Sequence, residues 1–213
     1  LPYGLFPERL AAFVPRQNPL PDPPRLAFVG TFDPRKGMRE WPALADAVAR
    51  AHPAAAFRLI GTSGLVPTAD GVRAHFPARL RPRVEVVPRF EPADLPGVLA
   101  DCSLGVFPSH CEGFGFGVLE MLAAGLPVVA YRAPGPPAML PPENLMPKGD
   151  GAAVGRRAAA LLGDPDELRA ARRAARARAE QFRWDEIAAR TAEVYLAARS
   201  AKSGAARAGG GRA

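Results

Sequence analysis

Cysteine and histidine are scarce in this sequence, which has 2 and 3 of them among 213 residues. Cys102 and Cys111 are too few for a disulfide framework, and their positions lack the spacing of zinc ligands. The composition therefore argues against a disulfide-stapled secreted domain and against a structural zinc site. It favours a reducing compartment, which for this chain we take to be the cytoplasm.

Long apolar runs are also missing. No segment approaches the ~20 consecutive apolar residues that a membrane-spanning helix needs. Residues 1–17 carry the acidic Glu8 and are too poor in apolar residues for a signal peptide. We therefore expect a cytoplasmic protein that is soluble or at most peripheral to the membrane.

Basic residues outnumber acidic ones, with 28 Lys and Arg, 21 Asp and Glu and a formal net charge of +7. A basic balance suits nucleic acid or an anionic lipid, and it equally suits a small phosphorylated ligand. Part of the charge lies in residues 200–213, a tail of small residues that we expect to be disordered. Charge alone leaves the kind of partner open.

Short apolar segments alternate with segments of helical periodicity along the chain. The predicted strands are residues 25–30, 56–61, 84–88, 104–108, 127–130 and 144–147. The predicted helices are residues 37–52, 69–80, 92–102, 116–125, 151–163, 165–181 and 185–199. Because most of the strands are apolar throughout and helices separate them, they predict a parallel sheet with helices on both faces, a Rossmann-like α/β fold.

Glycines and polar residues follow the predicted strands. Gly30 and Thr31 follow the first strand, Gly61 follows the second, and Arg89 and Phe90 follow the third. The carboxyl ends of parallel strands meet at one edge of a sheet, and ligands bind in the crevice beyond that edge. We therefore expect these residues to border one site, as a nucleotide would require.

The most patterned stretch, SHCEGFGFGVLEMLAAGLPVVAY, spans residues 109–131 and joins the fourth predicted strand to a helix. Its glycines let backbone N–H groups approach a ligand, and the helix start near Phe116 can hold an anion such as phosphate. Glu112 and Glu120 flank this point. Carboxylates repel a phosphate but accept hydrogen bonds from hydroxyl groups beside it, so the pair predicts a ribose and a sugar flanking a diphosphate.

The same stretch also permits an interpretation without a ligand. The glycines can belong to an ordinary loop and the two glutamates to the surface. The spacing is neither the dinucleotide-binding fingerprint nor a P-loop, so the glycines alone do not identify a phosphate site.

The stretch resembles the E-x7-E segment of retaining family 4 glycosyltransferases of the GT-B fold. LAFVGTFDPRKG (26–37) resembles that family's first strand and phosphate loop, FRLIGTSG (57–64) its second strand and glycine turn, and FRWDEIAARTAEVY (182–195) its closing helix. The likeness covers residues 25–198, nearly the whole chain. It implies that the chain is one half of a GT-B architecture, the half that binds the donor.

The resemblance also implies a reaction and a set of site residues. The reaction is a retaining hexosyl transfer from a nucleotide-diphosphate sugar, with no metal ion and no other cofactor. The catalytic residues would be Glu112, near the sugar hydroxyls, and Lys36, at the leaving diphosphate, while Glu120 would bind the ribose. Electrostatic stabilisation of the departing diphosphate would be the main catalytic contribution. The other donor-binding residues would be Gly30, Thr31, Arg35, Gly61, Arg89, Phe90, Phe114, Gly115 and Phe116.

The sequence departs from the family pattern in two residues and in extent. Thr31 stands where the family has an arginine, with Arg35 as a nearby substitute, and Ala138 stands where it often has a glutamate. We expect three parts: residues 1–24 as an interdomain remnant and proline-rich linker, residues 25–199 as the nucleotide-sugar domain, and residues 200–213 as the tail. The acceptor-binding domain or subunit is then a partner outside this chain.

Two patterns point to other functions. The arginine-rich residues 169–183 can bind nucleic acid or a membrane surface, although a solvated helix face explains them better because no aromatic residue stands between the cations before Phe182. We expect no nucleic acid, while a peripheral membrane contact would suit a lipid acceptor. Asp164 and Asp166 have the D-x-D spacing of a metal site in another glycosyltransferase fold, but Asp166 suits a helix N-terminus.

We favour the donor domain of a glycosyltransferase. The alternatives are a non-catalytic nucleotide-sugar binding module, one subunit of a split glycosyltransferase, a basic nucleic-acid or membrane-surface binding domain, and a related GT-B epimerase.

Overall fold

The computed structural model describes residues 3–15 and 20–209, with the backbone alone for residues 200–209. Six strands form one parallel sheet in the order β3-β2-β1-β4-β5-β6. The strands are β1 (Arg25–Val29), β2 (Ala56–Ile60), β3 (Val84–Val87), β4 (Leu104–Phe107), β5 (Val128–Tyr131) and β6 (Leu145–Met146). The predicted parallel α/β sheet is therefore confirmed, and each strand begins and ends within one residue of its predicted bounds.

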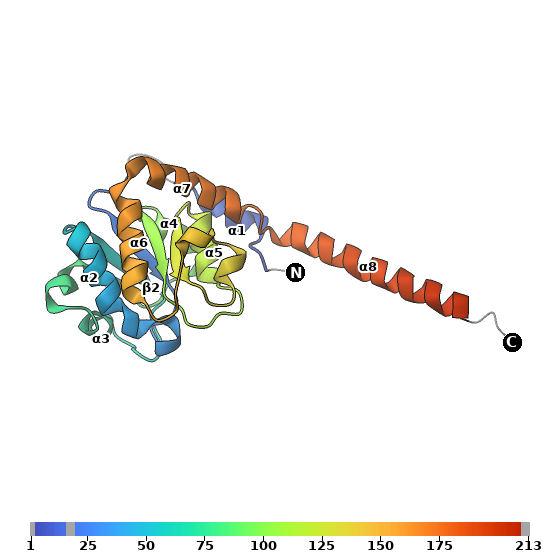
Figure 1. Ribbon diagram of the computed structural model, residues 1–213, viewed down its shortest axis with the longest axis horizontal. Coiled ribbons are helices and arrows are strands. Elements are labelled where there is room, and N and C mark those ends of the chain that lie inside the picture. The colour runs from blue at the N-terminus through green and yellow to red at the C-terminus, as the bar shows by residue number, and fades with distance from the viewer. Residues whose placement is uncertain (1–2, 16–19, 210–213) are drawn as a thin grey trace.

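The described residues form eight α-helices, of which α8 projects away from the sheet (Figure 1). They are α1 (Pro7–Ala12), α2 (Trp41–Ala51), α3 (Ala69–Ala74), α4 (Leu95–Leu99), α5 (Phe116–Ala123), α6 (Gly151–Gly163), α7 (Pro165–Ala179) and α8 (Trp184–Gly209). Short 3-10 turns include η1 (Pro34–Lys36), η2 (Met38–Glu40) and η4 (Pro92–Asp94). Helices α2 and α6 pack together on one face of the sheet, and α5 packs between the other face and α7.

Aromatic rings and glycines explain how the helices meet the sheet. Trp41 of α2 is fully buried and packs edge-on against Phe28 of β1, with ring centroids 5.7 Å apart. Burying one large apolar side chain stabilises the fold by about 1.5–3 kcal/mol. A Cβ on Gly105 of β4 would lie 2.6 Å from Sδ of Met121, so the glycine lets α5 approach the sheet closely.

The strand order reverses between β1 and β4. The chain moves from β1 outward to β2 and β3, then returns to place β4 on the other side of β1 and continues to β5 and β6. Strands β1 and β4 pair through Leu26 with Leu104 and Ala27 with Gly105. In open parallel sheets the loops diverge at such a reversal and leave a crevice at the carboxyl ends of the two strands.

The N-terminal segment packs onto the domain. The backbone N–H of Leu5 donates to the carbonyl of Phe182 at 2.9 Å, and that of Trp184 donates to the carbonyl of Leu5 at 2.8 Å. Leu10 and Phe13 are buried. Part of the expected remnant and linker, residues 3–13, is therefore held against the domain, with Leu5, Leu10 and Phe13 in the core. Residues 1–2 and 16–19 lie outside the described residues.

The C-terminal helices differ from expectation in two ways. Arg172 of α7 is 1% exposed and donates to the carbonyls of Cys102 and Ser103, while Arg176 donates to three backbone carbonyls, so the basic helix is not simply a solvated face. Figure 1 shows α8 extending far beyond the rest of the domain. Its backbone is helical to Gly209, where we expected a disordered tail.

Candidate functional site

A cavity of about 550 Å³ lies at the strand reversal, at the carboxyl ends of β1 and β4. The last residues of these strands, Val29 and Phe107, both line it. Its other lining residues are Tyr3, Gly30, Thr31, Arg35, Lys36, Glu112, Gly113, Phe114, Gly115, Phe116 and Gly117. Eight of the twelve predicted site residues therefore meet around one cavity, although the chain separates them by up to 86 positions (30 to 116).

The glycine-rich turn brings the start of α5 to the cavity. Gly115 precedes the helix with φ +97°, in the left-handed region that favours glycine. A Cβ on Gly117 would lie only 2.4 Å from the carbonyl oxygen of Val29, so this glycine lets the first turn of α5 press against the end of β1. The unpaired N–H groups of that turn and the positive end of the helix dipole suit an anion.

Lys36 and Glu112, the predicted catalytic pair, form an ion pair in the cavity wall. Nζ of Lys36 donates to Oε1 of Glu112, whose side chain is 8% exposed. Ser109 donates to the same oxygen at 2.5 Å. The ammonium of Lys36 also lies over the Phe107 ring, 5.6 Å from its centroid. The lysine therefore neutralises a nearly buried carboxylate.

The loop after β1 is fixed by its own hydrogen bonds. Thr31 donates to Asp33 at 2.7 Å, and Asp33 accepts from the backbone N–H of Lys36 at 3.0 Å. The backbone N–H of His110 donates to the carbonyl of Arg35 at 2.8 Å, which joins this loop to the glycine-rich turn. The two loops that carry Lys36 and the first glutamate therefore keep a set spacing.

The residues predicted to hold the base lie beside the cavity and not in its wall. Phe90 packs against Gly61, where an added Cβ would be 3.0 Å from the ring and 3.9 Å from the N atom of Gly30. Arg89 is exposed. Gly61, Phe90 and Gly30 thus form a continuous edge at the ends of β1 and β2, from which Arg89 extends into solvent.

Glu120, the predicted ribose-binding residue, lies outside the cavity wall and is paired with an arginine of the N-terminal segment. It is outside the cavity lining, and its side chain is 19% exposed. Its Oε1 accepts from Nη2 of Arg9 at 3.0 Å, and Nη1 of the same guanidinium donates to the carbonyl of Pro92. Burial raises the pKa of Glu120, and the hydrogen bond and charge of Arg9 oppose that rise.

Three residues that sequence reasoning missed belong to this region: Tyr3, Arg9 and Ser109. Ser109 stands three positions before Glu112, and this proximity in the loop was the available signal. Tyr3 lines the cavity and stacks on Trp184 with ring centroids 6.1 Å apart. No local pattern marks Tyr3 or Arg9, because both reach the site only through packing of the N-terminal segment.

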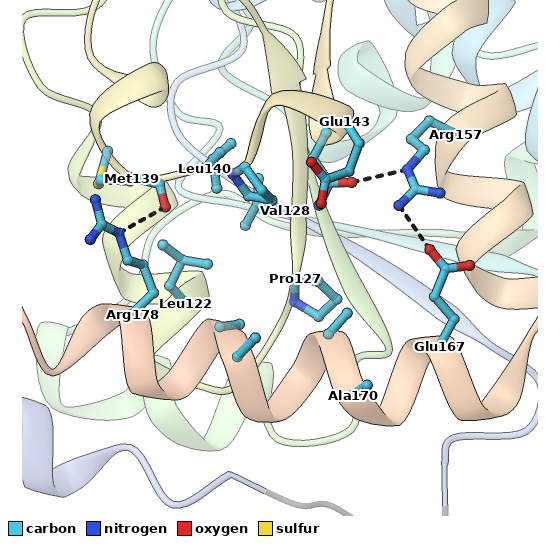
Figure 2. A pocket seen from close by; sticks show the side chains of 15 residues that line it. Leu122, Pro127, Val128, Met139, Leu140, Glu143, Arg157, Glu167, Ala170 and Arg178 are labelled. Carbon is cyan, nitrogen blue, oxygen red and sulfur yellow. Dashed lines mark hydrogen bonds and ion pairs between the residues drawn. The ribbon is translucent and has the colours of Figure 1, made fainter.

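A second cavity, of about 620 Å³, lies under α7 near β5 (Figure 2). Its wall is mostly apolar, and three of its four charged residues, Arg157, Glu167 and Arg178, already have partners. Arg157 donates to Asn144 at 3.0 Å and to Glu167 at 2.9 Å, while Arg178 donates to the carbonyl of Met139 at 3.3 Å. Neither the predicted catalytic pair nor the glycine-rich turn borders it, so the cavity at the strand reversal is the candidate functional site.

Three further features bear on the expected ligands. Asp164 caps α7 by accepting from the backbone N–H groups of Asp166 and Glu167, so the D-x-D carboxylate serves a helix start. Within residues 3–15 and 20–209, no cluster of three or more His, Cys, Asp or Glu side chains could hold a metal ion. Within the same residues, no helix is both long and apolar enough to cross a membrane.

A family model described as glycosyl transferases group 1 matches residues 23–164, well over half of the chain. The chain belongs to the glycosyl transferases group 1 family. The matched residues include β1 to β6, the glycine-rich turn and both glutamates of the E-x7-E segment. The family expected from the sequence is thereby confirmed at this level.

Individual relatives agree with this family. The chain is 34% identical over 180 residues to D-inositol 3-phosphate glycosyltransferase of Segniliparus rotundus, which covers 81% of this chain and 40% of that protein. It is 30% identical over 189 residues to glycogen synthase of Mycobacterium tuberculosis, covering 86% and 45%. The chain therefore spans less than half the length of these two relatives.

Solved structures confirm the fold. Sucrose-phosphate synthase from Thermosynechococcus elongatus matches with a TM-score of 0.75 and 27% identity, over 94% of this chain and 52% of that one. HepE from Anabaena, solved in complex with UDP-glucose, matches with a TM-score of 0.67 and 25% identity, over 92% and 54%. The sheet is the Rossmann-like half of a GT-B architecture.

Proposed function

We propose that this chain is the donor-binding domain of a retaining, family 4 type hexosyltransferase and binds a nucleotide-diphosphate sugar in the cavity at the strand reversal. The observation that carries the proposal is the convergence of Lys36, Glu112 and the start of α5 on one cavity of about 550 Å³. A cation and a helix N-terminus suit the diphosphate, and a carboxylate suits the sugar hydroxyls.

Binding would rearrange the Lys36–Glu112 pair. The arriving diphosphate carries more negative charge than one carboxylate, so Lys36 would turn from Glu112 to the phosphate oxygens. Glu112 would then accept hydrogen bonds from sugar hydroxyls while Ser109 continues to hold its Oε1. The exchange avoids leaving either charge buried without a partner, which would be costly.

The same groups would stabilise the departing diphosphate during transfer. Lys36 and the N–H groups of the first α5 turn would face the developing charge, and such fixed donors are a large catalytic contribution. Arg35 lines the cavity and is the cation available where Thr31 replaces the family's arginine. The mechanism would need no metal ion, and the leaving phosphate would help deprotonate the acceptor.

The remaining donor contacts would run along the edge of the sheet. Gly30 and Thr31 border the cavity, and Gly61, Phe90 and Arg89 continue from it toward the expected base. The turn of Phe114, Gly115 and Phe116 would contact the sugar and the diphosphate through its backbone. Glu120 would bind the ribose, from its position one turn into α5. The acceptor would come from a partner domain or subunit.

A basic nucleic-acid or membrane-surface function finds less support. Arg172, Arg176 and Arg178 of α7 all donate to backbone carbonyls of neighbouring segments. Their guanidinium groups therefore help to hold α7 on the domain, which gives these three arginines a structural role without a nucleic-acid or membrane partner.

Calorimetric titration with UDP, GDP, ADP and their glucose conjugates tests the proposal. We expect saturable one-to-one binding of one nucleotide series. The uridine series is the first candidate, because HepE was solved in complex with UDP-glucose. Lys36→Ala and Glu120→Gln should each weaken binding by about 1–3 kcal/mol, through lost charge-assisted hydrogen bonds. Glu143→Ala, which removes an exposed glutamate beside the second cavity, is the matched control. Absence of binding to every nucleotide by the folded chain would refute the proposal.

A further inference from the structure

Arg9 links two segments that are far apart in the sequence. Its guanidinium reaches from α1 to Glu120 on α5, at 3.0 Å, and to the carbonyl of Pro92 at the start of η4. The side chains of Arg9 and Glu120 are each 19% exposed, so water screens the pair only partly. Pro92 follows Arg89 and Phe90, the residues proposed to hold the base. A single side chain therefore connects the proposed ribose residue to the proposed base segment.

The surroundings keep Arg9 in place. The Phe13 ring lies beneath its guanidinium, 4.9 Å from the centroid. Arg176 of α7 fixes the backbone on which Arg9 stands, donating to the carbonyls of Leu10 at 3.1 Å and Phe13 at 2.8 Å. The same nitrogen donates to the carbonyl of Ala123 at 2.9 Å, which joins α1 to α5.

We propose that Arg9 is a positioning residue for the ribose end of the donor site, because it holds the Glu120 carboxylate in place and ties it to the segment that follows β3. The inference rests on the proposed function of Glu120. A ribose presents two neighbouring hydroxyl groups, and an ionised carboxylate can accept a hydrogen bond from each. The bond from Arg9 uses Oε1, so the carboxylate is turned by a fixed partner and not by solvent.

The charge on Glu120 depends on Arg9 in the same geometry. Burial raises the pKa of Glu120 and Arg9 opposes it. Among the described residues, Arg9 from α1 is the charged side chain that bonds to Glu120 and acts on its pKa. Arg176 from α7 reaches α5 only at the carbonyl of Ala123 and is otherwise bonded to the carbonyls of Leu10 and Phe13 and to Glu180. Removing Arg9 should therefore move the protonation of Glu120 to higher pH. As the pH is lowered, nucleotide affinity should therefore begin to fall at a higher pH in the variant than in the wild type. A protonated carboxyl group cannot accept hydrogen bonds from both ribose hydroxyls as well as an ionised one can.

The first arm of the test needs no nucleotide. Carbon-13 NMR of the glutamate carboxyl groups follows the titration of Glu120 in the wild type, in Arg9→Gln and in Arg9→Lys, with the resonance assigned by its loss in Glu120→Gln. We expect a higher midpoint in Arg9→Gln and a midpoint near that of the wild type in Arg9→Lys. Glu8→Ala, an exposed change in the same helix, should leave the midpoint unchanged. An unchanged midpoint in folded Arg9→Gln would overturn the inference.

The second arm compares UDP with 2′-deoxy-UDP by calorimetry across pH. The wild type should prefer UDP by about 10-fold or more, the loss expected for one hydrogen bond to a charged group. Arg9→Gln should show a smaller preference than the wild type, which should increase as the pH is raised, while Arg9→Lys should keep more of it. A mere loss of folding would lower both affinities together and leave their ratio unchanged.

The outcomes separate the inference from the proposed function. A wild-type preference that Arg9→Gln retains in full would overturn the role of Arg9 and leave the donor site standing. Equal affinity of the wild type for UDP and 2′-deoxy-UDP would overturn the ribose role of Glu120 and, with it, the positioning role of Arg9. Failure of the wild type to bind any nucleotide would refute the donor site itself.

Discussion

Adding one methyl group at Gly117 should disturb the site, whereas the same change at Gly113 should not. A Cβ at Gly117 would lie 2.4 Å from the carbonyl oxygen of Val29 and 3.3 Å from the Phe107 ring. At Gly113, in the same turn, it would meet nothing within 4 Å. Both changes are Gly→Ala in neighbouring positions, so each serves as a control for the other.

The loss of stability expected for Gly117→Ala follows from the contact with Val29. The carbonyl of Val29 belongs to the central strand and cannot turn away, so the first turn of α5 must move by roughly half an ångström or more. Overpacking of this kind costs about 1–3 kcal/mol. In a chain of this size it should lower the melting temperature by roughly 2–4 °C per kcal/mol. Gly113→Ala should remain within about 0.5 kcal/mol of the wild type.

Urea denaturation and thermal melting of the two variants measure the difference, and UDP titration measures its effect on the site. Gly117→Ala should also weaken UDP binding, because the helix start that faces the diphosphate has moved away from β1. Equal stability of both variants would show that α5 does not press on β1 as described. Loss of stability in Gly113→Ala alone would contradict the placement of the whole turn.

Three other properties can be tested. Lys36→Met should destabilise the chain by up to about 3–5 kcal/mol, because it leaves the nearly buried Glu112 carboxylate without its cation. Adding Glu112→Gln should restore most of that stability in denaturation experiments. A double variant no more stable than Lys36→Met would contradict the importance of the ion pair. Arg176→Met should release the N-terminal segment and speed its cleavage in limited proteolysis, a result that unchanged cleavage would contradict. Burial raises the pKa of Cys102 to about 12, so iodoacetamide near neutral pH should modify only the exposed Cys111 in the native chain. In denaturant it should modify both thiols, as mass spectrometry would show. Modification of Cys102 before Cys111 in the native chain would contradict the prediction.

The sequence by itself determined the strands, the parallel sheet and the glycine-rich turn. Each depends on residues close together in the chain: apolar runs of four to six residues, glycines at their ends, and helical periodicity between them. The one-residue agreement of all six strands has this origin. Helix α5 likewise begins at Phe116, where the glycine spacing and the two glutamates indicated a helix start.

Only the tertiary structure decided which of these pieces meet. The order of the strands puts β4 beside β1, and this pairing brings Lys36 to Glu112 across 76 positions. Packing of the N-terminal segment brings Arg9 to Glu120 across 111 positions, although nothing in the sequence near Arg9 indicates a site. The sequence predicts a solvated basic face for α7, whereas the fold brings backbone carbonyls to Arg172, Arg176 and Arg178. Local patterns cannot specify such contacts, because each one depends on where a distant segment is held by the common core.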